Sequence, residues 1–360
     1  WIMAYTTIDD PSEYFTTTLY TGNGSSIDVT NSANSGNFAP DWLWIKERSA
    51  TSSHIIFDTN RPVSGGFAKH LHANENAAES GDSSELTAFG SNGFSYGSDG
   101  KGNQSSQTYV AWNWKANGGT TSSNSDGDIT STVQANTTAG FSIVTFTGNG
   151  NNDATIGHGL GTTPAMIITK NRDDAVLWRV WHQNLTSTNV LFLNENFAQT
   201  APSGHSNGYI KTVGSSTYSV YEGNSDTNGV NGSSDDMVAY CFAEKQGYSK
   251  FGSYEANNNT DGPFVYIGFK PSFLILKAID QTGNWFIFDN KRDTDNAVSQ
   301  IIYADLSASE GSTAVLDFVS NGVKIRNSGS GGINHSGTYI YMAFAENPFV
   351  SSKGVPVTAR

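Results

Sequence analysis

Two histidines lie close enough in the sequence to bind a zinc ion together. His70 and His72 are two positions apart, so on a β-strand their imidazoles would lie on the same face. Imidazole nitrogens are common ligands of zinc. The pair occurs only once in the chain, whereas other landmarks recur three times. This favours a structural role for the two histidines over a zinc site.

Two acidic runs have the spacing of calcium-binding loops. Asp126 and Asp128 in one run, and Asp226 and Asn228 in the other, place oxygen ligands at alternating positions. Neither run is followed by the bidentate Glu of an EF-hand. Ordinary polar turns of the same composition are the alternative interpretation. Calcium is therefore the single cofactor to consider, and otherwise none is expected.

One cluster of aromatic and polar residues is the best candidate for binding a ligand. Sugar recognition uses a flat aromatic face for stacking and nearby polar groups for the hydroxyls. Most tryptophans lie on expected strands and are predicted to be core residues. The exceptions are Trp178 and Trp181, which flank Arg179 and stand next to His182. We predict a ligand patch at these four residues.

An acidic and a basic residue three positions apart occur twice, as Asp58 with Arg61 and as Asp289 with Arg292. Each pair follows an Ile-Phe-Asp step. A carboxylate and a guanidinium at this spacing can brace a loop through paired hydrogen bonds. The corresponding place in the middle of the chain has His182 and no following arginine. Because the pair follows the same kind of strand twice, we predict a structural bracket in preference to a ligand contact.

No catalytic constellation can be identified in the sequence. The glycine runs at 22–24 and 148–150 lack the Lys-Ser/Thr of a phosphate loop, and His158 stands where a nucleophile elbow needs Ser. Acidic residues are scattered through polar segments, so no acid–base pair stands out. Cys241, the single cysteine, lies within an apolar run and is expected to be a buried hydrophobe. We predict that the chain is not an enzyme.

The elements that hold these residues are repeated three times. In each copy a proline precedes five mostly apolar residues and a lysine, a segment that we call the cassette. Four landmarks recur in one order: the cassette (40–46, 164–170 and 271–277), an aromatic residue (Phe57, Trp181 and Phe288), an Asn-Gly-apolar triplet (92–94, 207–209 and 321–323) and a closing apolar run (109–114, 237–242 and 339–344). This recurrence indicates internal repeats.

The pattern predicts an all-β protein made of three tandem β-sandwich modules, jelly-roll or lectin-like, with short loops and little helix. Short β-branched and aromatic segments alternate with turn signals roughly every ten residues. The cassette is apolar at nearly every position, which is typical of a strand covered on both faces. Its lysine is expected to hold its ammonium group in water. Ile45, Ile168 and Ile275 are expected in like surroundings.

The repeats set the expected domain boundaries. These are a lead-in at residues 1–14, repeat 1 at 15–117, a polar linker at 118–139, repeat 2 at 140–247, repeat 3 at 248–349 and a tail at 350–360. The Gly-, Ser- and Asn-rich composition between repeats 1 and 2 is typical of a flexible linker. Only a few residues join repeats 2 and 3. We therefore expect these two to pack closely and repeat 1 to be tethered more loosely.

The composition excludes several classes of partner. The net charge is −13, from 33 acidic and 20 basic residues, and no cluster of Lys and Arg is present to bind nucleic acid. The same charge disfavours anionic membrane surfaces. No apolar run approaches the roughly eighteen residues of a membrane-spanning segment.

Four segments of the chain resemble a known group of proteins: residues 5–15, 157–164, 239–245 and 284–292. They are similar to uncharacterised three-repeat structural proteins of marine tailed bacteriophages, described as tail-fibre-like or lectin-like. The resemblance extends from about Met3 to Phe349. It implies a virion component at the particle surface, and it implies no catalytic residues.

These observations favour a non-enzymatic phage structural protein, a tail fibre or surface adhesin that binds a host glycan or envelope component. Weak contacts of this kind gain from multivalency, so a homo-oligomer is expected, and by analogy with fibres a trimer. A capsid-decoration or tail-assembly protein with other virion proteins as its only partners is the alternative. A polysaccharide depolymerase is the third hypothesis and would need a carboxylate pair in a groove.

Overall fold

The computed structural model describes residues 5–34, 36–61, 67–186, 188–201, 208–221, 229–328 and 332–357. Nearly all the regular structure in these ranges is β-strand. Its helical elements are the four-residue α1 (Gly100–Asn103) and the 3-10 turn η1 (Pro11–Glu13). None of the helices found there is long and apolar enough to cross a membrane. The prediction of an all-β fold with little helix is confirmed.

Each repeat contributes a set of antiparallel strands in the same spatial order, which we call its inner sheet. The order is the opening strand, the closing strand, the cassette strand and the strand after the cassette. These are β1 (Phe15–Thr21), β7 (Thr108–Trp114), β3 (Trp42–Glu47) and β4 (Ile55–Asp58) in repeat 1; β10 (Phe141–Thr147), β17 (Asp236–Phe242), β12 (Met166–Asn171) and β13 (Arg179–His182) in repeat 2; and β18 (Ser249–Glu255), β25 (Thr338–Pro348), β20 (Phe269–Ala278) and β21 (Phe286–Asp289) in repeat 3. The sequence landmarks therefore occupy equivalent places.

Further strands cover the outer face of each inner sheet. They are β2 (Ile27–Thr30), β5 (Leu86–Gly90) and β6 (Gly93–Tyr96) in repeat 1; β11 (Thr155–Gly157), β15 (Tyr209–Val213) and β16 (Thr217–Tyr221) in repeat 2; and β19 (Phe264–Tyr266), β22 (Val298–Tyr303), β23 (Gly311–Val319) and β24 (Gly322–Ile325) in repeat 3. In repeat 3 they continue the inner sheet through β21 and β22 into one eight-stranded sheet. The short β14 (Leu191–Phe192) extends the inner sheet of repeat 2 beyond β13.

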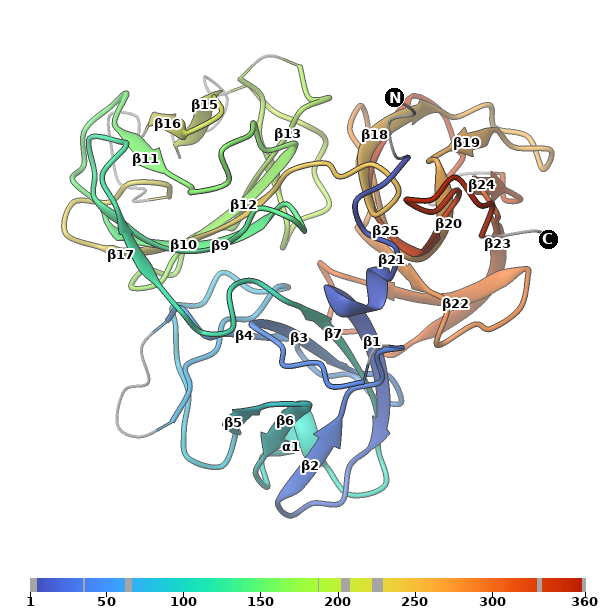
Figure 1. The fold of residues 1–360 in the computed structure, drawn as a ribbon, viewed down its shortest axis with the longest axis horizontal. Coiled ribbons are helices and arrows are strands. Elements are labelled where there is room, and N and C mark those ends of the chain that lie inside the picture. Colours follow the sequence, from blue (N-terminus) through green and yellow to red (C-terminus); the bar gives the residue numbers. More distant parts are fainter. Residues whose placement is uncertain are drawn as a thin grey trace.

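The inner sheets bury both of their faces, which explains the unbroken apolar cassettes. Alternate cassette residues point to opposite faces of a strand. Leu43, Ile167 and Leu274 each lie in a separate core within their own repeat. The residues on either side of them contribute to one core common to all the repeats: Trp42, Trp44, Met166, Ile168, Phe273 and Ile275. Figure 1 shows the corresponding three groups of sheets around a common centre. The predicted burial of the cassette on both faces is confirmed.

Residues 118–139 are not a free linker, which corrects the sequence-based prediction. They contain β8 (Ser122–Asn124) and β9 (Ser131–Asn136), and β9 pairs with β10 of repeat 2. Val133 and Ile129 pack into the core of repeat 2. The polar composition hid this strand because its neighbours supply most of the apolar surface. The expectation that repeat 1 is loosely tethered is also wrong, since its tryptophans lie in the shared core.

The prediction for the cassette lysines is wrong as well. Lys46, Lys170 and Lys277 are fully buried. Their ammonium groups donate to backbone carbonyls, for example Lys170 Nζ to the oxygens of Asn171 at 2.6 Å and Asp174 at 2.9 Å. Burial, and to a smaller extent the positive charge of the nearby Arg179, lower the pKa of Lys170 to about 7. Burial likewise lowers the pKa of Lys46 and of Lys277 to about 8.

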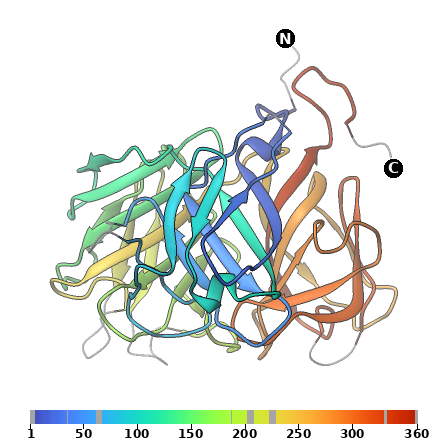
Figure 2. The same ribbon diagram turned by 90° about the horizontal axis from the view of Figure 1, so that it is seen from below.

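The two ends of the described chain lie together against repeat 3. Ile8 packs into the shared core, and the Tyr5 hydroxyl donates to the Gly268 carbonyl at 2.6 Å. The backbone amide of Ser352 donates to the Asp9 carboxylate at 2.6 Å. Figure 2 shows η1 and the chain after β25 on the same side of the molecule. The lead-in and the first part of the tail are therefore attached to the folded body.

Candidate functional site

The predicted ligand patch is buried, and this corrects the sequence-based assignment. Trp178, Arg179 and His182 expose no more than 1% of their surface, and Trp181 is only partly exposed while packing against the core of repeat 2. The indole nitrogen of Trp178 donates to the carbonyl of His72 in repeat 1 at 2.8 Å. These residues join repeats to one another, so they do not form a surface on which a ligand could stack.

The candidate calcium ligands fall into two groups. Asp226 and Asn228 lie outside the described residues. The Asp128 carboxylate accepts hydrogen bonds from the amide and hydroxyl of Thr155 at 3.0 and 2.8 Å, and Asp126 accepts from the Asn124 side chain. In the part of the chain that is described, neither aspartate belongs to a group of three potential metal ligands. The polar-turn interpretation therefore suits Asp126 and Asp128 better.

Both predicted brackets are present and have the same geometry. The Asp58 carboxylate accepts from the Arg61 side chain at 2.6 Å, and the Asp289 carboxylate accepts from the Arg292 side chain at 2.6 Å. All four side chains are almost completely buried. Burial alone would lower the pKa of Arg61, but the acidic groups around it, of which Asp58 contributes most, together outweigh burial and raise that pKa. The prediction of a structural bracket is confirmed.

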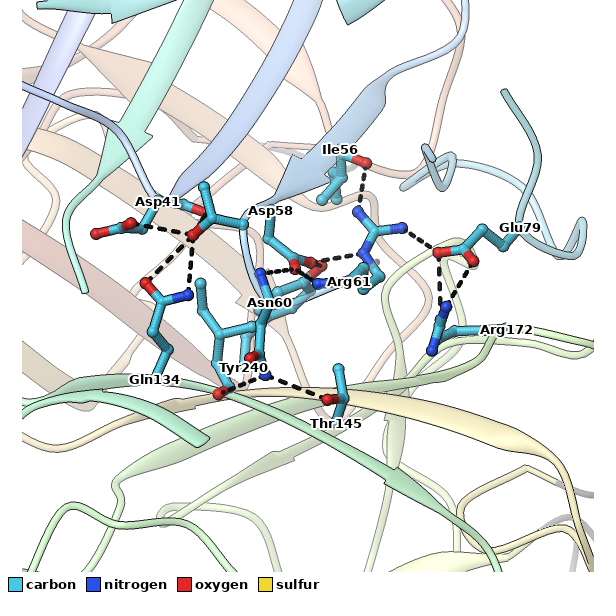
Figure 3. A network of polar contacts seen from close by, with 12 residues as sticks. Asp41, Ile56, Asp58, Asn60, Arg61, Glu79, Gln134, Thr145, Arg172 and Tyr240 are labelled. Carbon is cyan, nitrogen blue, oxygen red and sulfur yellow. Dashed lines mark hydrogen bonds and ion pairs between the residues drawn. The ribbon is translucent and has the colours of Figure 1, made fainter. Parts of the chain in front are cut away.

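Each bracket also joins its repeat to the next one. Arg61 donates to Glu79 at 2.7 Å, and Glu79 accepts from Arg172 of repeat 2 at 2.8 Å (Figure 3). Asn60, next to Arg61, donates to the backbone of β9 and β10. Figure 3 shows these residues as one polar network between the inner strands of repeat 1 and those of repeat 2. No local sequence pattern indicated this contact between repeats, because Glu79 and Arg172 are far apart along the chain.

The bracket of repeat 3 makes the matching contacts with repeat 1. Arg292 donates to Glu310 at 3.1 Å, and Glu310 accepts from Arg48 of repeat 1 at 2.8 Å. The Asp289 carboxylate accepts from the indole nitrogen of Trp112 at 3.0 Å. In repeat 2 the residue at the position of Asp289 is His182. Its Nε2 atom lies 3.3 Å from the backbone oxygen of Tyr341 in repeat 3. Repeat 1 thus contacts repeat 2, repeat 2 contacts repeat 3, and repeat 3 contacts repeat 1.

Repeat 3 carries the most accessible aromatic side chains of the described residues, and we call Phe264 and Tyr266 the β19 aromatic pair. They expose 49% and 59% of their surface, while Val265 between them is 7% exposed. Strand alternation therefore places both rings on one outward face. Tyr266 also interacts with Tyr5, near the start of the described chain. Burial, and to a smaller extent a hydrogen bond with Tyr266, raises the pKa of the Tyr5 hydroxyl to about 12. The sequence-based predictions did not include this pair, although strand alternation in Phe264-Val265-Tyr266 places the two aromatic rings on the same face.

A cavity of about 540 Å³ lies on the same repeat. Lys270, four residues after Tyr266, lines it and forms an ion pair with Glu346 at 2.5 Å. Most of the remaining lining is short and polar: Asn290, Asp293, Thr294, Asp295, Asn296, Ser320 and Asn347. The side-chain oxygen of Asn290 is buried and has no hydrogen-bond partner among the described residues. A wall of amides, carboxylates and hydroxyls suits a ligand rich in hydroxyl groups.

One known family matches almost the whole chain. Residues 10–348 match a family described as a domain of unknown function, DUF7483. The chain belongs to this family. No curated protein matches the chain, and no solved structure matches it either. The DUF7483 match includes all the repeats, their brackets, the β19 aromatic pair and the residues from Lys270 to Asn347 that line the cavity.

Proposed function

We propose that this chain is a non-enzymatic binding protein of a phage virion surface, and that repeat 3 binds a host glycan. The observation that carries the proposal is the presence of the β19 aromatic pair and the polar cavity on one repeat. An exposed ring can stack on a sugar, and amides and carboxylates can bond its hydroxyl groups. The resemblance to phage tail-fibre-like proteins supports the location at the virion surface.

The rest of the molecule supports a scaffold role for the other repeats. Trp42, Trp44, Trp112, Trp114, Trp178 and Trp285 are all fully buried. The buried bracket carboxylates accept hydrogen bonds from other repeats, Asp58 from Tyr240 of repeat 2 and Asp289 from Trp112 of repeat 1. A rigid scaffold holds an exposed site in one geometry, which lowers the entropy lost on binding. A homotrimer would then present three such sites to one host surface and increase the avidity.

The proposal is tested by binding of the purified full-length chain to a glycan array and to host cells. We expect saturable binding that Tyr266→Ala weakens about 10-fold, the usual effect of truncating a central aromatic contact. Phe197→Ala is the matched control, because Phe197 is 42% exposed but lies in repeat 2. Binding that both variants reduce equally, or no binding to any glycan or cell, would contradict the proposal.

An architectural role with other virion proteins as partners is the second candidate. The observation that favours it is the position of β19, which ends the eight-stranded sheet and pairs with β24 on one side. A free strand edge can add a strand from another chain. Tight association with a capsid or tail protein, together with no glycan binding, would support this role. Release of reducing ends from a host polysaccharide would instead identify a depolymerase.

A further inference from the structure

His70 and His72 of repeat 1 face each other across a short gap. They flank Leu71, whose backbone pairs with Ile56 of β4, so strand alternation puts both imidazoles on the same side. The two Nε2 atoms are 3.1 Å apart. His70 is buried, whereas His72 is half-buried and the neighbouring Ser80 is exposed. The gap between the two rings therefore lies near the surface.

The other ring nitrogen of each histidine has a partner that fixes its tautomer. His72 Nδ1 lies 2.8 Å from the carbonyl oxygen of His54, which can only accept, so this nitrogen carries a hydrogen. His70 Nδ1 lies 2.6 Å from the Glu85 carboxylate, which also accepts from Lys101 at 3.0 Å. In their neutral forms both rings therefore present a lone pair at Nε2. Two lone pairs at this distance repel unless a positive charge lies between them.

We propose that His70 and His72 bind a transition-metal ion through their Nε2 atoms. With metal–nitrogen bonds of about 2.05 Å, their separation of 3.1 Å corresponds to an N–metal–N angle of roughly 98°. This lies between the square-planar and tetrahedral angles of about 90° and 109°. Histidine ligands in metal sites usually donate their second nitrogen to a carboxylate or a backbone carbonyl. Glu85 and the His54 carbonyl supply those two acceptors.

The donor set indicates the class of metal. Two imidazoles favour zinc, nickel, copper or cobalt over calcium and magnesium, which prefer oxygen ligands. The Ser80 hydroxyl oxygen lies 3.1 Å from His70 Nε2. Among the described residues, no third His, Cys, Asp or Glu converges on both imidazoles. The protein therefore supplies two strong ligands, and water would fill the other positions.

Metal binding would connect the two histidines to the interface between repeats 1 and 2. The backbone oxygen of His72 accepts a hydrogen bond from the indole nitrogen of Trp178 at 2.8 Å. Fixing the His72 ring also fixes this backbone position. A ligand that binds the folded chain and not the unfolded one raises the unfolding temperature in proportion to the logarithm of its concentration. Binding at this site is thus expected to appear as thermal stabilisation.

The test uses the tag-free full-length chain, titrated with zinc chloride in a calorimeter and with cobalt chloride in an absorption spectrometer. We expect one ion per chain, a visible cobalt band and a higher unfolding temperature with zinc. His72→Ala should remove the cobalt band and weaken zinc at least 10-fold, and Glu85→Gln should weaken it about 10- to 100-fold. His335→Ala is the control, since His335 lies in repeat 3, close to Gln281 and away from the pair.

Two outcomes would overturn the proposal. One is the absence of saturable binding to the wild-type chain at millimolar zinc, which would mean that the imidazoles share a proton only. The other is binding that His72→Ala leaves unchanged, which would place the metal elsewhere. Far-ultraviolet circular dichroism of each variant separates lost binding from lost folding. Glycan binding is measured independently, so failure of this proposal leaves the proposed function intact.

Discussion

The Asp58 carboxylate is buried among hydrogen-bond donors from two repeats. Its two oxygens accept from the Arg61 side chain at 2.6 Å, from the Arg61 amide at 2.8 Å and from the Tyr240 hydroxyl of repeat 2 at 2.7 Å. The residue type at this place follows the donor that faces it. Asp289 faces the Trp112 indole nitrogen, whereas His182 faces the backbone oxygen of Tyr341, which cannot donate. A carboxylate in place of His182 would lack such a donor.

Replacing Tyr240 by Phe tests the energetic value of this contact. The substitution removes one donor to a buried carboxylate and leaves the ring in the shared core. We expect the free energy of unfolding to fall by about 1–3 kcal/mol, the usual cost of leaving a buried polar group short of a partner. Urea denaturation followed by tryptophan fluorescence measures this change. Tyr209→Phe, at a partly exposed tyrosine of β15, is the control and should change stability by less than about 0.5 kcal/mol. Equal effects of the two variants would contradict the argument.

At the scale of the elements, the next-to-last residue of each cassette strand is a lysine whose ammonium group is buried. Lys170 has a pKa lowered to about 7 in the folded chain, from an ordinary value of 10.5. Between pH 7 and 10.5 the unfolded chain therefore binds a proton at this lysine that the folded chain does not. Stability rises with pH wherever the unfolded state binds more protons. Lys46 and Lys277 act in the same direction, because their pKa values are also lowered.

We accordingly predict that the free energy of unfolding increases from pH 7 to pH 9.5. The share of Lys170 has an upper limit of about 3.5 kcal/mol, because this range spans about 2.5 pH units and each unit is worth about 1.4 kcal/mol. Lys170→Met should make this increase smaller. Lys250→Met, at a lysine of β18 that is 37% exposed, should leave the increase unchanged. Urea titrations at both pH values provide the measurement, and a stability that falls over this range would refute the prediction.

The strands were predictable because the apolar patterns that indicate them lie within short segments of the chain. Five apolar residues in a row indicated a strand covered on both faces, and β3, β12 and β20 are such strands. The register was harder to predict. Ile45 lies in the separate core of repeat 1, whereas Ile168 and Ile275 lie in the shared core. Ile45 is five residues after its proline and the other two are four, and a shift of one residue reverses the face of a strand.

The predicted ligand site was wrong because burial depends on partners far away in sequence. The strand β13 carries Trp181 and His182 and belongs to a repeat that looked self-contained, so its side chains were expected to face solvent. In the structure Trp178 reaches repeat 1 and His182 reaches repeat 3. The buried lysines and the strand within residues 118–139 were missed for the same reason. The composition of a segment therefore does not show whether residues elsewhere in the chain will cover it.

At the scale of the whole molecule, the repeats share a core and are not independent bodies. The largest hydrophobic cluster contains side chains from the inner sheets of all three repeats. Trp285 of repeat 3 donates to the Phe192 carbonyl of repeat 2, and His54 of repeat 1 lies 2.9 Å from the Tyr303 carbonyl of repeat 3. Removing any one repeat would expose the apolar inner sheets of the other two to water. Such exposure costs free energy in proportion to its area.

We therefore predict a single cooperative unfolding transition for the full-length chain. Differential scanning calorimetry should give one peak whose calorimetric and van't Hoff enthalpies agree. Trp285→Phe removes a hydrogen bond between repeats, and Val265→Ala makes a cavity in the separate core of repeat 3. Both variants should lower the temperature of that one peak, because a loss in either core destabilises the same cooperative unit. Independent repeats would behave differently: Val265→Ala would shift an early peak for repeat 3 and leave a later peak in place. Two or three resolved peaks in the wild-type chain would thus show that the shared core does not couple the repeats.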